Sequence, residues 1–150
     1  MRTVWFLLIL MVLPPAVFAE GKPLPRGIDA LGIAVPVSLD MAAGDLDRIK
    51  GTVTKNGKFV TITTDSGCLL SINLNGNADR LVKIVVQLRK DQYAELLRTT
   101  QEFSAENQYK KEKAGHNEIH TWNDTKTLIR LAYMKDFFRL DLMDLKEVEE

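Results

Sequence analysis

The sequence predicts a single α+β domain, a curled antiparallel sheet of about six to seven strands with one long helix inserted after the fourth core strand. Three observations predict it. Short β-branched segments alternate with turn residues up to position 88, the apolar spacing is helical over 91–114, and strand-like segments resume from 116. Consecutive strands with short connections are typical of an antiparallel meander.

The first 19 residues have the pattern of a cleaved signal peptide. Arg2 precedes an unbroken apolar run, Val4–Leu13, and residues 17–19 supply a cleavage site that ends in alanine. Spanning a bilayer takes about 20 apolar residues, so this run is too short for a lasting anchor. We therefore expect cleavage before Glu20 and a periplasmic or secreted protein without a stable membrane span.

Residues 20–45 are rich in proline, glycine and alanine and show no sustained helical or strand period. Such a composition is typical of an extended segment rather than of a domain. Apolar residues alternate over 33–39, and this part could add one edge strand. We therefore expect a loosely structured leader over 20–45 and a globular domain over 46–143.

Four strands are expected in the first half of this domain, each bounded by turn residues: 48–54, 59–64, 68–74 and 81–88. Asn56-Gly57 is a favoured two-residue hairpin turn. Residues 65–67 and the Asn- and Gly-rich stretch 75–79 supply the next two turns.

Past Leu88 the apolar residues recur at three- and four-residue spacing as far as Phe103. Asp91 is placed as the N-terminal cap of a helix and Gly115 as its stop, which predicts a helix over about 91–114. Because the apolar stripe ends near Phe103, either the last turns extend past the sheet into solvent or the helix breaks early.

Three further strands are expected after the helix, at 116–122, 125–133 and 137–142, and the acidic residues 144–150 are expected to form a frayed tail. Asn123 begins a glycosylation sequon in the first turn between these strands, which matters only in a eukaryotic secretory route.

The last two strands carry apolar residues on both faces. Phe137 and Phe138 put one aromatic on each face, and Met134 joins the apolar side chains of the preceding strand. A flat sheet with one face in water would alternate more cleanly. We therefore expect a curled sheet, a covering helix or a covering partner, with Met134, Phe137 and Phe138 as candidate partner-binding residues.

The composition excludes several classes of function. The 150 residues carry 20 Lys+Arg and 20 Asp+Glu, so the formal net charge is zero and no global attraction to nucleic acid is expected. The chain contains no G-x-S-x-G elbow, no paired-glycine dinucleotide fingerprint and no C-x-x-C pair. These absences do not favour an enzyme.

His116, Glu118 and His120 form the sharpest candidate site. The only two histidines stand four residues apart with a carboxylate midway, and a strand would put all three side chains on one face. Imidazole and carboxylate ligands suit zinc or copper. A polar, solvent-facing strand is the competing interpretation, because three ligands on one short strand splay and no fourth ligand is evident.

Cys68 is the only cysteine, so no intramolecular disulfide can form. It would be a nucleophile only if His116 or His120 lay beside it as a base. Its apolar neighbours Leu69 and Leu70 favour a buried structural cysteine instead. An intermolecular disulfide is a further alternative for an unpaired cysteine in an exported protein.

The leading hypothesis is an exported, non-catalytic protein that binds a macromolecular partner, either an envelope or secreted protein or a second copy of itself, with no cofactor expected. The alternative is a periplasmic protein that binds zinc or copper through His116, Glu118 and His120. The third is a thiol-dependent enzyme that uses Cys68.

Overall fold

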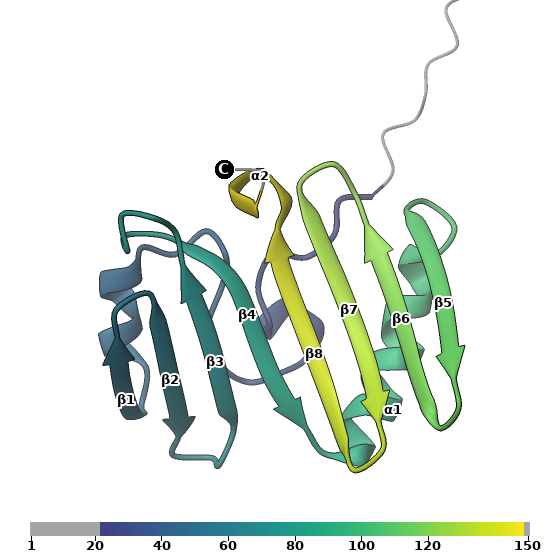
Figure 1. Cartoon of the computed structure of the whole chain (residues 1–150), viewed down its shortest axis with the longest axis horizontal. Coiled ribbons are helices and arrows are strands. Elements are labelled where there is room, and N and C mark those ends of the chain that lie inside the picture. Colours follow the sequence, from purple (N-terminus) through teal and green to yellow (C-terminus); the bar gives the residue numbers. More distant parts are fainter. Residues whose placement is uncertain (1–21, 149–150) are drawn as a thin grey trace, which may run out of the picture.

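In the computed structural model, which describes residues 22–148, eight antiparallel strands form one open sheet (Figure 1). The strands are β1 (Gly51–Asn56), β2 (Phe59–Thr64), β3 (Leu69–Leu74), β4 (Leu81–Leu88), β5 (Gln108–Ala114), β6 (Asn117–Asn123), β7 (Thr127–Met134) and β8 (Phe137–Asp144). The helices are α1 (Lys90–Thr100) and α2 (Leu145–Val148), with 3-10 helices η1 (Asp29–Leu31), η2 (Ala43–Arg48) and η3 (Gln101–Phe103). The α+β class agrees broadly with this architecture, whereas the expected signal peptide lies outside the described residues.

The sheet consists of two meanders that meet at β4 and β8. Its strand order is β1-β2-β3-β4-β8-β7-β6-β5, and every neighbouring pair is antiparallel. After β4 the chain runs through α1 to β5 at the far edge, and β6, β7 and β8 then return strand by strand towards β4 (Figure 1). A helix is therefore inserted after the fourth strand, as predicted.

The expected helix over 91–114 is wrong in its second half. Helix α1 ends at Thr100, η3 continues the chain to Phe103, and residues 108–114 form the edge strand β5, in which every residue is exposed. The apolar stripe ends at Phe103, so later helical turns would have no apolar face to bury, whereas β5 satisfies its backbone by pairing with β6. The sheet therefore has eight strands rather than six or seven.

Gly115, expected to stop the helix, lies instead in the turn between β5 and β6. Its φ of 61° is in the left-handed region that favours glycine, so this residue lets the chain reverse between the two strands.

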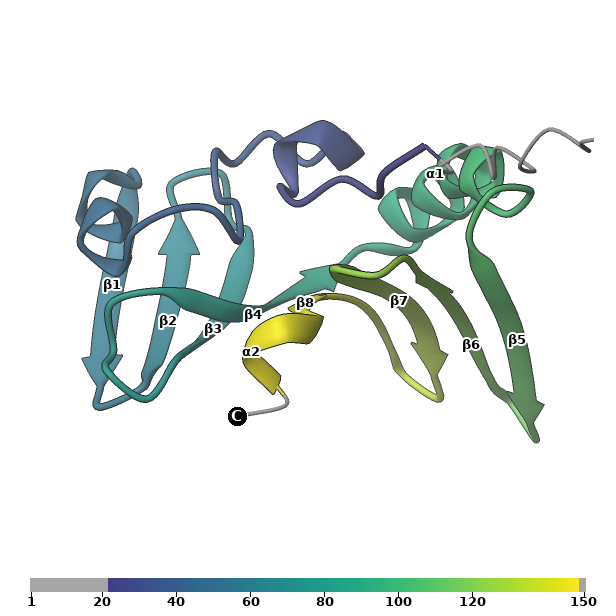
Figure 2. The ribbon, with the colours of Figure 1, turned by 90° about the horizontal axis from the view of Figure 1, so that it is seen from above.

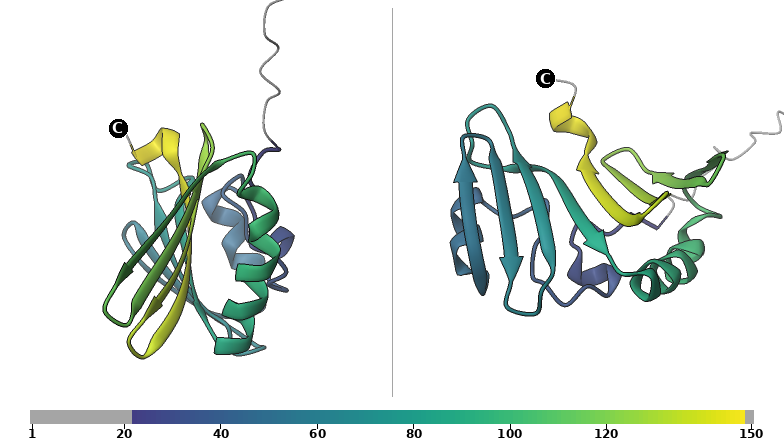
Figure 3. Two further views of the ribbon diagram at one scale, coloured as in Figure 1. Left: turned by 90° about the vertical axis from the view of Figure 1, so that its right-hand side faces the viewer. Right: turned by 60° about the horizontal axis from the view of Figure 1, so that its bottom comes forward.

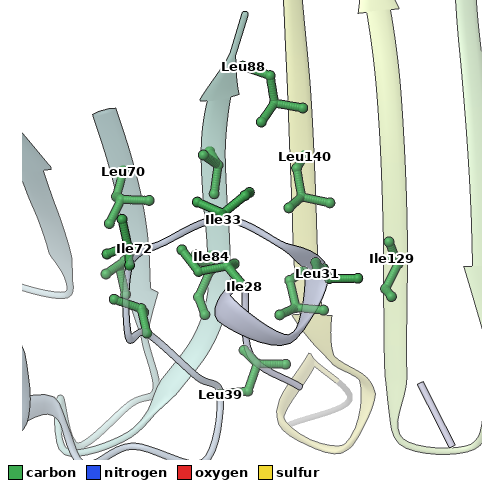
Figure 4. Close-up of a cluster of buried hydrophobic side chains, with 14 of the residues drawn as sticks. Ile28, Leu31, Ile33, Leu39, Leu70, Ile72, Ile84, Leu88, Ile129 and Leu140 are labelled. Carbon is green, nitrogen blue, oxygen red and sulfur yellow. The ribbon is translucent and has the colours of Figure 1, made fainter. Parts of the chain in front are cut away.

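Residues 22–50 form a layer over one face of the sheet, here called the covered face (Figure 2). The sequence predicts a loosely structured leader over 20–45 instead. Nine apolar side chains of this layer are buried: Leu24, Ile28, Leu31, Ile33, Val35, Val37, Leu39, Leu46 and Ile49. Several of them lie against side chains of β3, β4, β7 and β8, such as Ile84 and Leu140 (Figure 4). This burial contradicts a loosely structured segment.

Over residues 33–39 every second side chain is buried, as in a strand, but the backbone forms no ladder of hydrogen bonds with a neighbouring strand. Val35 N–H donates to Ile33 O (2.7 Å) and Val37 N–H donates to Val35 O (2.8 Å), so the backbone closes tight local turns. The segment makes only isolated bridges, such as Gly27 with Ser38, and the expected edge strand does not form within the described chain.

Arg26 binds this layer to the ends of two strands. Its Nη2 donates to Asp144 Oδ2 (2.5 Å) in β8, its Nη1 to Thr127 Oγ1 (3.0 Å) in β7, and its Nε to Asp40 Oδ1 (2.8 Å) within the layer. Asp144, expected to begin a frayed tail, is buried at the end of β8, and α2 follows it.

The Arg26–Asp144 ion pair makes the free energy of unfolding depend on pH in the acid range. Burial raises the pKa of Asp144, but hydrogen bonds from Arg26 and from backbone N–H groups, together with the guanidinium charge, outweigh burial and lower the pKa below its ordinary value. A carboxyl group with a lowered folded-state pKa stabilises the protein above its unfolded pKa, and this contribution is lost as the pH falls through the folded pKa.

We therefore expect the free energy of unfolding to decrease below about pH 4, with a smaller decrease in Asp144→Asn, because asparagine has no proton to gain. Urea unfolding of both proteins across the acid range measures this. If the free energies of unfolding of the two proteins differed by the same amount at every pH, the Arg26–Asp144 pair would not be the cause of the pH dependence.

The opposite face of the sheet, here called the open face, carries no such layer over the described residues (Figure 3). Strand β2 shows the contrast, because its side chains alternate strictly between exposed and buried. Helix α2 leans to the open side at one end of β8, while α1 lies on the covered side (Figures 2 and 3). Within residues 22–148, no helix has the length and apolar character needed to cross a membrane.

Candidate functional site

The open face is built from alternate residues of every strand, aligned by the strand register. One row across the sheet contains Thr54, Thr61, Ser71, Val85, Asp141, Arg130, Thr121 and Lys110. Strands β1–β3 contribute small polar side chains to this row, β8 and β7 contribute the charged Asp141 and Arg130, and the edge strand β5 contributes Lys110. One group of charged side chains therefore lies on β4, β8 and β7, close to where the two meanders meet, and a second lies on β5.

Asp141 lies at the centre of this face, yet its side chain is only 1% exposed because basic side chains cover it. Arg139 Nη2 donates to Asp141 Oδ2 (3.0 Å), and Arg130 Nη1 and Lys83 Nζ lie 3.8 and 4.0 Å from the same oxygen. Arg139 Nε also lies 2.8 Å from Asp141 Oδ1, but the two atoms are not aligned as a hydrogen bond. Three cations therefore share one buried carboxylate.

The strand geometry explains why these four residues meet. Arg139 and Asp141 are two positions apart in β8 and so share a face, and Arg130 of β7 is the direct cross-strand partner of Asp141. Lys83 is a diagonal neighbour in β4, two positions from Val85, the other partner of Asp141. We call Lys83, Arg130, Arg139 and Asp141 the basic cluster.

A shallow pocket of about 280 Å³ adjoins this cluster. It is lined by Leu69, Ser71, Val85, Gln87, Phe137, Phe138 and Arg139. Phe137 is 41% exposed and Leu69 is 37% exposed, so both present apolar surface to solvent. Apolar side chains and Arg139 therefore border one pocket.

The structure brings two of the three predicted partner-binding residues to the open face. Met134 and Phe137 are cross-strand partners at the turn between β7 and β8. Phe138 points to the covered face, where its ring centroid lies 4.8 Å from that of Tyr133 and 5.0 Å from that of Tyr93 in α1. Phe138 therefore serves mainly to pack the helix on the sheet.

Of the three predicted metal ligands, Glu118 and His120 lie together but His116 does not join them. His120 is buried on the covered face, and its Nε2 lies 2.5 Å from Glu118 Oε1. Its Nδ1 lies 2.8 Å from the hydroxyl of Tyr109, so both ring nitrogens have partners. His116 is exposed in the turn before β6, and among residues 22–148 no three His, Cys, Asp or Glu side chains are placed to hold a metal ion.

Glu118, His120 and Tyr109 form a hydrogen-bonded chain that connects β6 to the edge strand β5. The rings of Tyr109, His120 and Trp122 are stacked, and Trp122 Nε1 donates to Ser104 Oγ (2.9 Å) after η3. Tyr109 is absent from the predicted site because its position lies in the expected helix. These contacts attach the edge strand β5 to β6 on the covered face of the sheet.

Cys68 lies just before β3, half-buried beside a cavity of about 480 Å³ that Arg89 and Gln92 also line. Burial raises the pKa of its thiol, with partial opposition from the charge of Arg89. His120 is on β6, with β4, β8 and β7 between it and β3, so it is not placed as a base for this thiol.

We expect Cys68 in the native protein to react with iodoacetamide at neutral pH about tenfold more slowly than in the urea-unfolded chain, because burial disfavours the thiolate. The time course of the mass increase measures both rates. A native rate above the unfolded rate would support a thiol-dependent enzyme instead.

Comparison of the chain with protein families, with curated proteins and with solved structures finds no match.

Proposed function

We propose that this is an exported, non-catalytic protein that binds another protein on the open face of its sheet. The observation that carries the proposal is the asymmetry of the sheet, whose covered face is filled by the chain's own layer while the open face presents apolar side chains. The N-terminal pattern of a short apolar run and a cleavage site supports export.

The exposed apolar side chains are unevenly distributed between the two faces. Among the described residues, four large apolar side chains are exposed, and Phe59, Leu69 and Phe137 of these belong to the open face by their register. A sheet face in water is normally polar, and grouped apolar side chains on such a face are typical of an interaction site. The pocket between Leu69 and Phe137 gives a partner side chain a place to be buried.

Site-specific photo-crosslinking of the full chain in its native cells tests the proposal. A benzophenone amino acid replaces Phe137 on the open face in one variant, and Arg98 on the outer side of α1 in the control. Arg98 is well exposed, so both probes reach solvent. We expect a discrete crosslinked protein from position 137 and none from position 98.

The mass of that product identifies the partner, and a product of twice the monomer mass indicates a second copy of the chain. The intact mass of the purified protein also tests the proposed export, because signal cleavage before Glu20 would remove residues 1–19. Equal crosslinking from both positions, or none from position 137, would overturn the binding proposal.

A further inference from the structure

We infer that the partner presents a carboxylate beside a large apolar side chain, as an acidic peptide segment does. In this arrangement the basic cluster binds the carboxylate and the pocket beside Phe137 receives the apolar group. This inference rests on the proposed function and specifies the chemistry of the partner.

Charge favours an anion at this place. By the strand register, the basic residues of the open face are Lys83, Lys110, Arg130 and Arg139, and the acidic ones are Glu112 and Asp141. Lys110 and Glu112 pair with each other (2.5 Å), which leaves three cations and one carboxylate in the cluster. Because the whole chain is neutral, this local excess of two positive charges distinguishes the open face.

The cations also retain binding capacity. Asp141 is the only carboxylate within 4.0 Å of Arg130 or Lys83 among the described residues, and neither contact is as short as a hydrogen bond. The side chains of Lys83, Arg130 and Arg139 are 26%, 36% and 34% exposed, so they are accessible to a ligand from solvent. Guanidinium groups bind carboxylates with two parallel hydrogen bonds, which gives geometric selectivity.

Arg139 connects the charged and apolar parts of the site. It belongs to the basic cluster and also lines the pocket with Leu69, Val85 and Phe137. The Asp141 carboxylate holds its guanidinium in place, which reduces the conformational entropy lost on binding. A ligand that uses both parts must therefore carry its carboxylate close to its apolar group.

The dimensions of the site favour a peptide over a membrane. A pocket of about 280 Å³ holds an apolar side chain, and Ser71 and Gln87 on its border offer hydrogen bonds to a peptide backbone. Membrane surfaces are usually bound by about four to eight clustered Lys and Arg side chains, more than this cluster contains. The size and lining of the site therefore favour an acidic, apolar polypeptide segment.

Fluorescence anisotropy with two labelled peptides tests the inference on the mature protein. One peptide alternates aspartate with phenylalanine, and the other has asparagine at each aspartate position. We expect the acidic peptide to bind at least about tenfold more tightly, with an affinity that decreases as salt increases.

Matched variants separate the two parts of the site. Lys83→Gln combined with Arg130→Gln leaves the Arg139–Asp141 pair in place and is expected to weaken binding of the acidic peptide about tenfold, whereas Arg98→Gln is expected to have no effect. Phe137→Ala is expected to weaken binding of the acidic peptide by a similar factor. Phe59 lies on the same face but outside the pocket, so Phe59→Ala is expected to leave this binding unchanged. Circular dichroism of each variant verifies that it is folded.

Equal affinity for the two peptides would overturn the inference, as would binding to phosphatidylglycerol vesicles in place of the acidic peptide. Crosslinking from position 137 that persists unchanged in the Lys83→Gln, Arg130→Gln protein would retain the proposed function and reject the acidic partner.

Discussion

Replacing Ile28 by alanine is expected to lower the free energy of unfolding by about 2–5 kcal/mol, the range for truncating a buried aliphatic side chain. Ile28 belongs to the N-terminal layer, residues 22–50, and its side chain is completely buried against the sheet (Figure 4). Its backbone N–H donates to Val37 O (3.0 Å), and its carbonyl accepts from Leu31 and Ile33, so the site is held on both sides and cannot readily collapse.

Ala34→Ser is the control, because Ala34 is exposed in the same segment. Its expected effect on the free energy of unfolding is within about 0.5 kcal/mol. Urea unfolding followed by circular dichroism measures both variants. If Ile28→Ala were as mild as Ala34→Ser, the segment would not be part of the cooperative fold.

Trp122→Ala is expected to cost about 3–5 kcal/mol, as for other buried aromatic side chains. Trp122 is completely buried, with its ring 5.2 Å from that of Tyr109 and 5.9 Å from that of His120. The substitution removes one of the three stacked rings that connect β6 to the edge strand β5. We therefore also expect faster amide hydrogen exchange along β5.

Trp122→Phe separates packing from hydrogen bonding. Phenylalanine retains much of the buried ring but cannot donate to Ser104, so a smaller cost of about 1–2 kcal/mol is expected. Denaturant unfolding measures both variants, and Ile119→Ala on the half-buried, opposite side of β6 serves as the control. A cost below about 1 kcal/mol for Trp122→Ala would contradict the role of the stack.

The sequence predicts all the strands except β5, because local signals, turn residues and alternating apolar residues, mark the others. Turn residues such as Gly57 and Gly67, both with positive φ, separate segments whose β-branched residues alternate between faces. The second half of the expected helix is wrong because residues 108–114 have no apolar period of either kind. Only pairing with β6, whose sequence follows later, makes them a strand.

The N-terminal layer is harder to predict for a related reason. Its prolines and glycines exclude long regular elements, yet one side of the segment is apolar, as the alternation of Ile33, Val35 and Val37 indicates. Which surface those side chains cover depends on the complete sheet, and no local pattern contains that information.

The basic cluster depends on register in the same way. Asp141 lies between Leu140 and Leu142, and Arg130 between Ile129 and Leu131, so a charge interrupts an apolar run in each strand. Those interruptions are the sequence signal for the cluster. That Arg130 faces Asp141 follows only from the pairing of β7 with β8.

The attachment of the N-terminal layer to the final strand imposes an order on folding. Arg26 and Asp144 are 118 positions apart, and Leu24 N–H donates to Asp124 across 100 positions. A chain that emerges N-terminus first therefore cannot complete the contacts of this layer until β7 and β8 have been made. Because β8 completes the surface on which the first segment packs, a chain that stops before Phe137 lacks the buried side chains of Leu140 and Leu142 and leaves part of its core exposed.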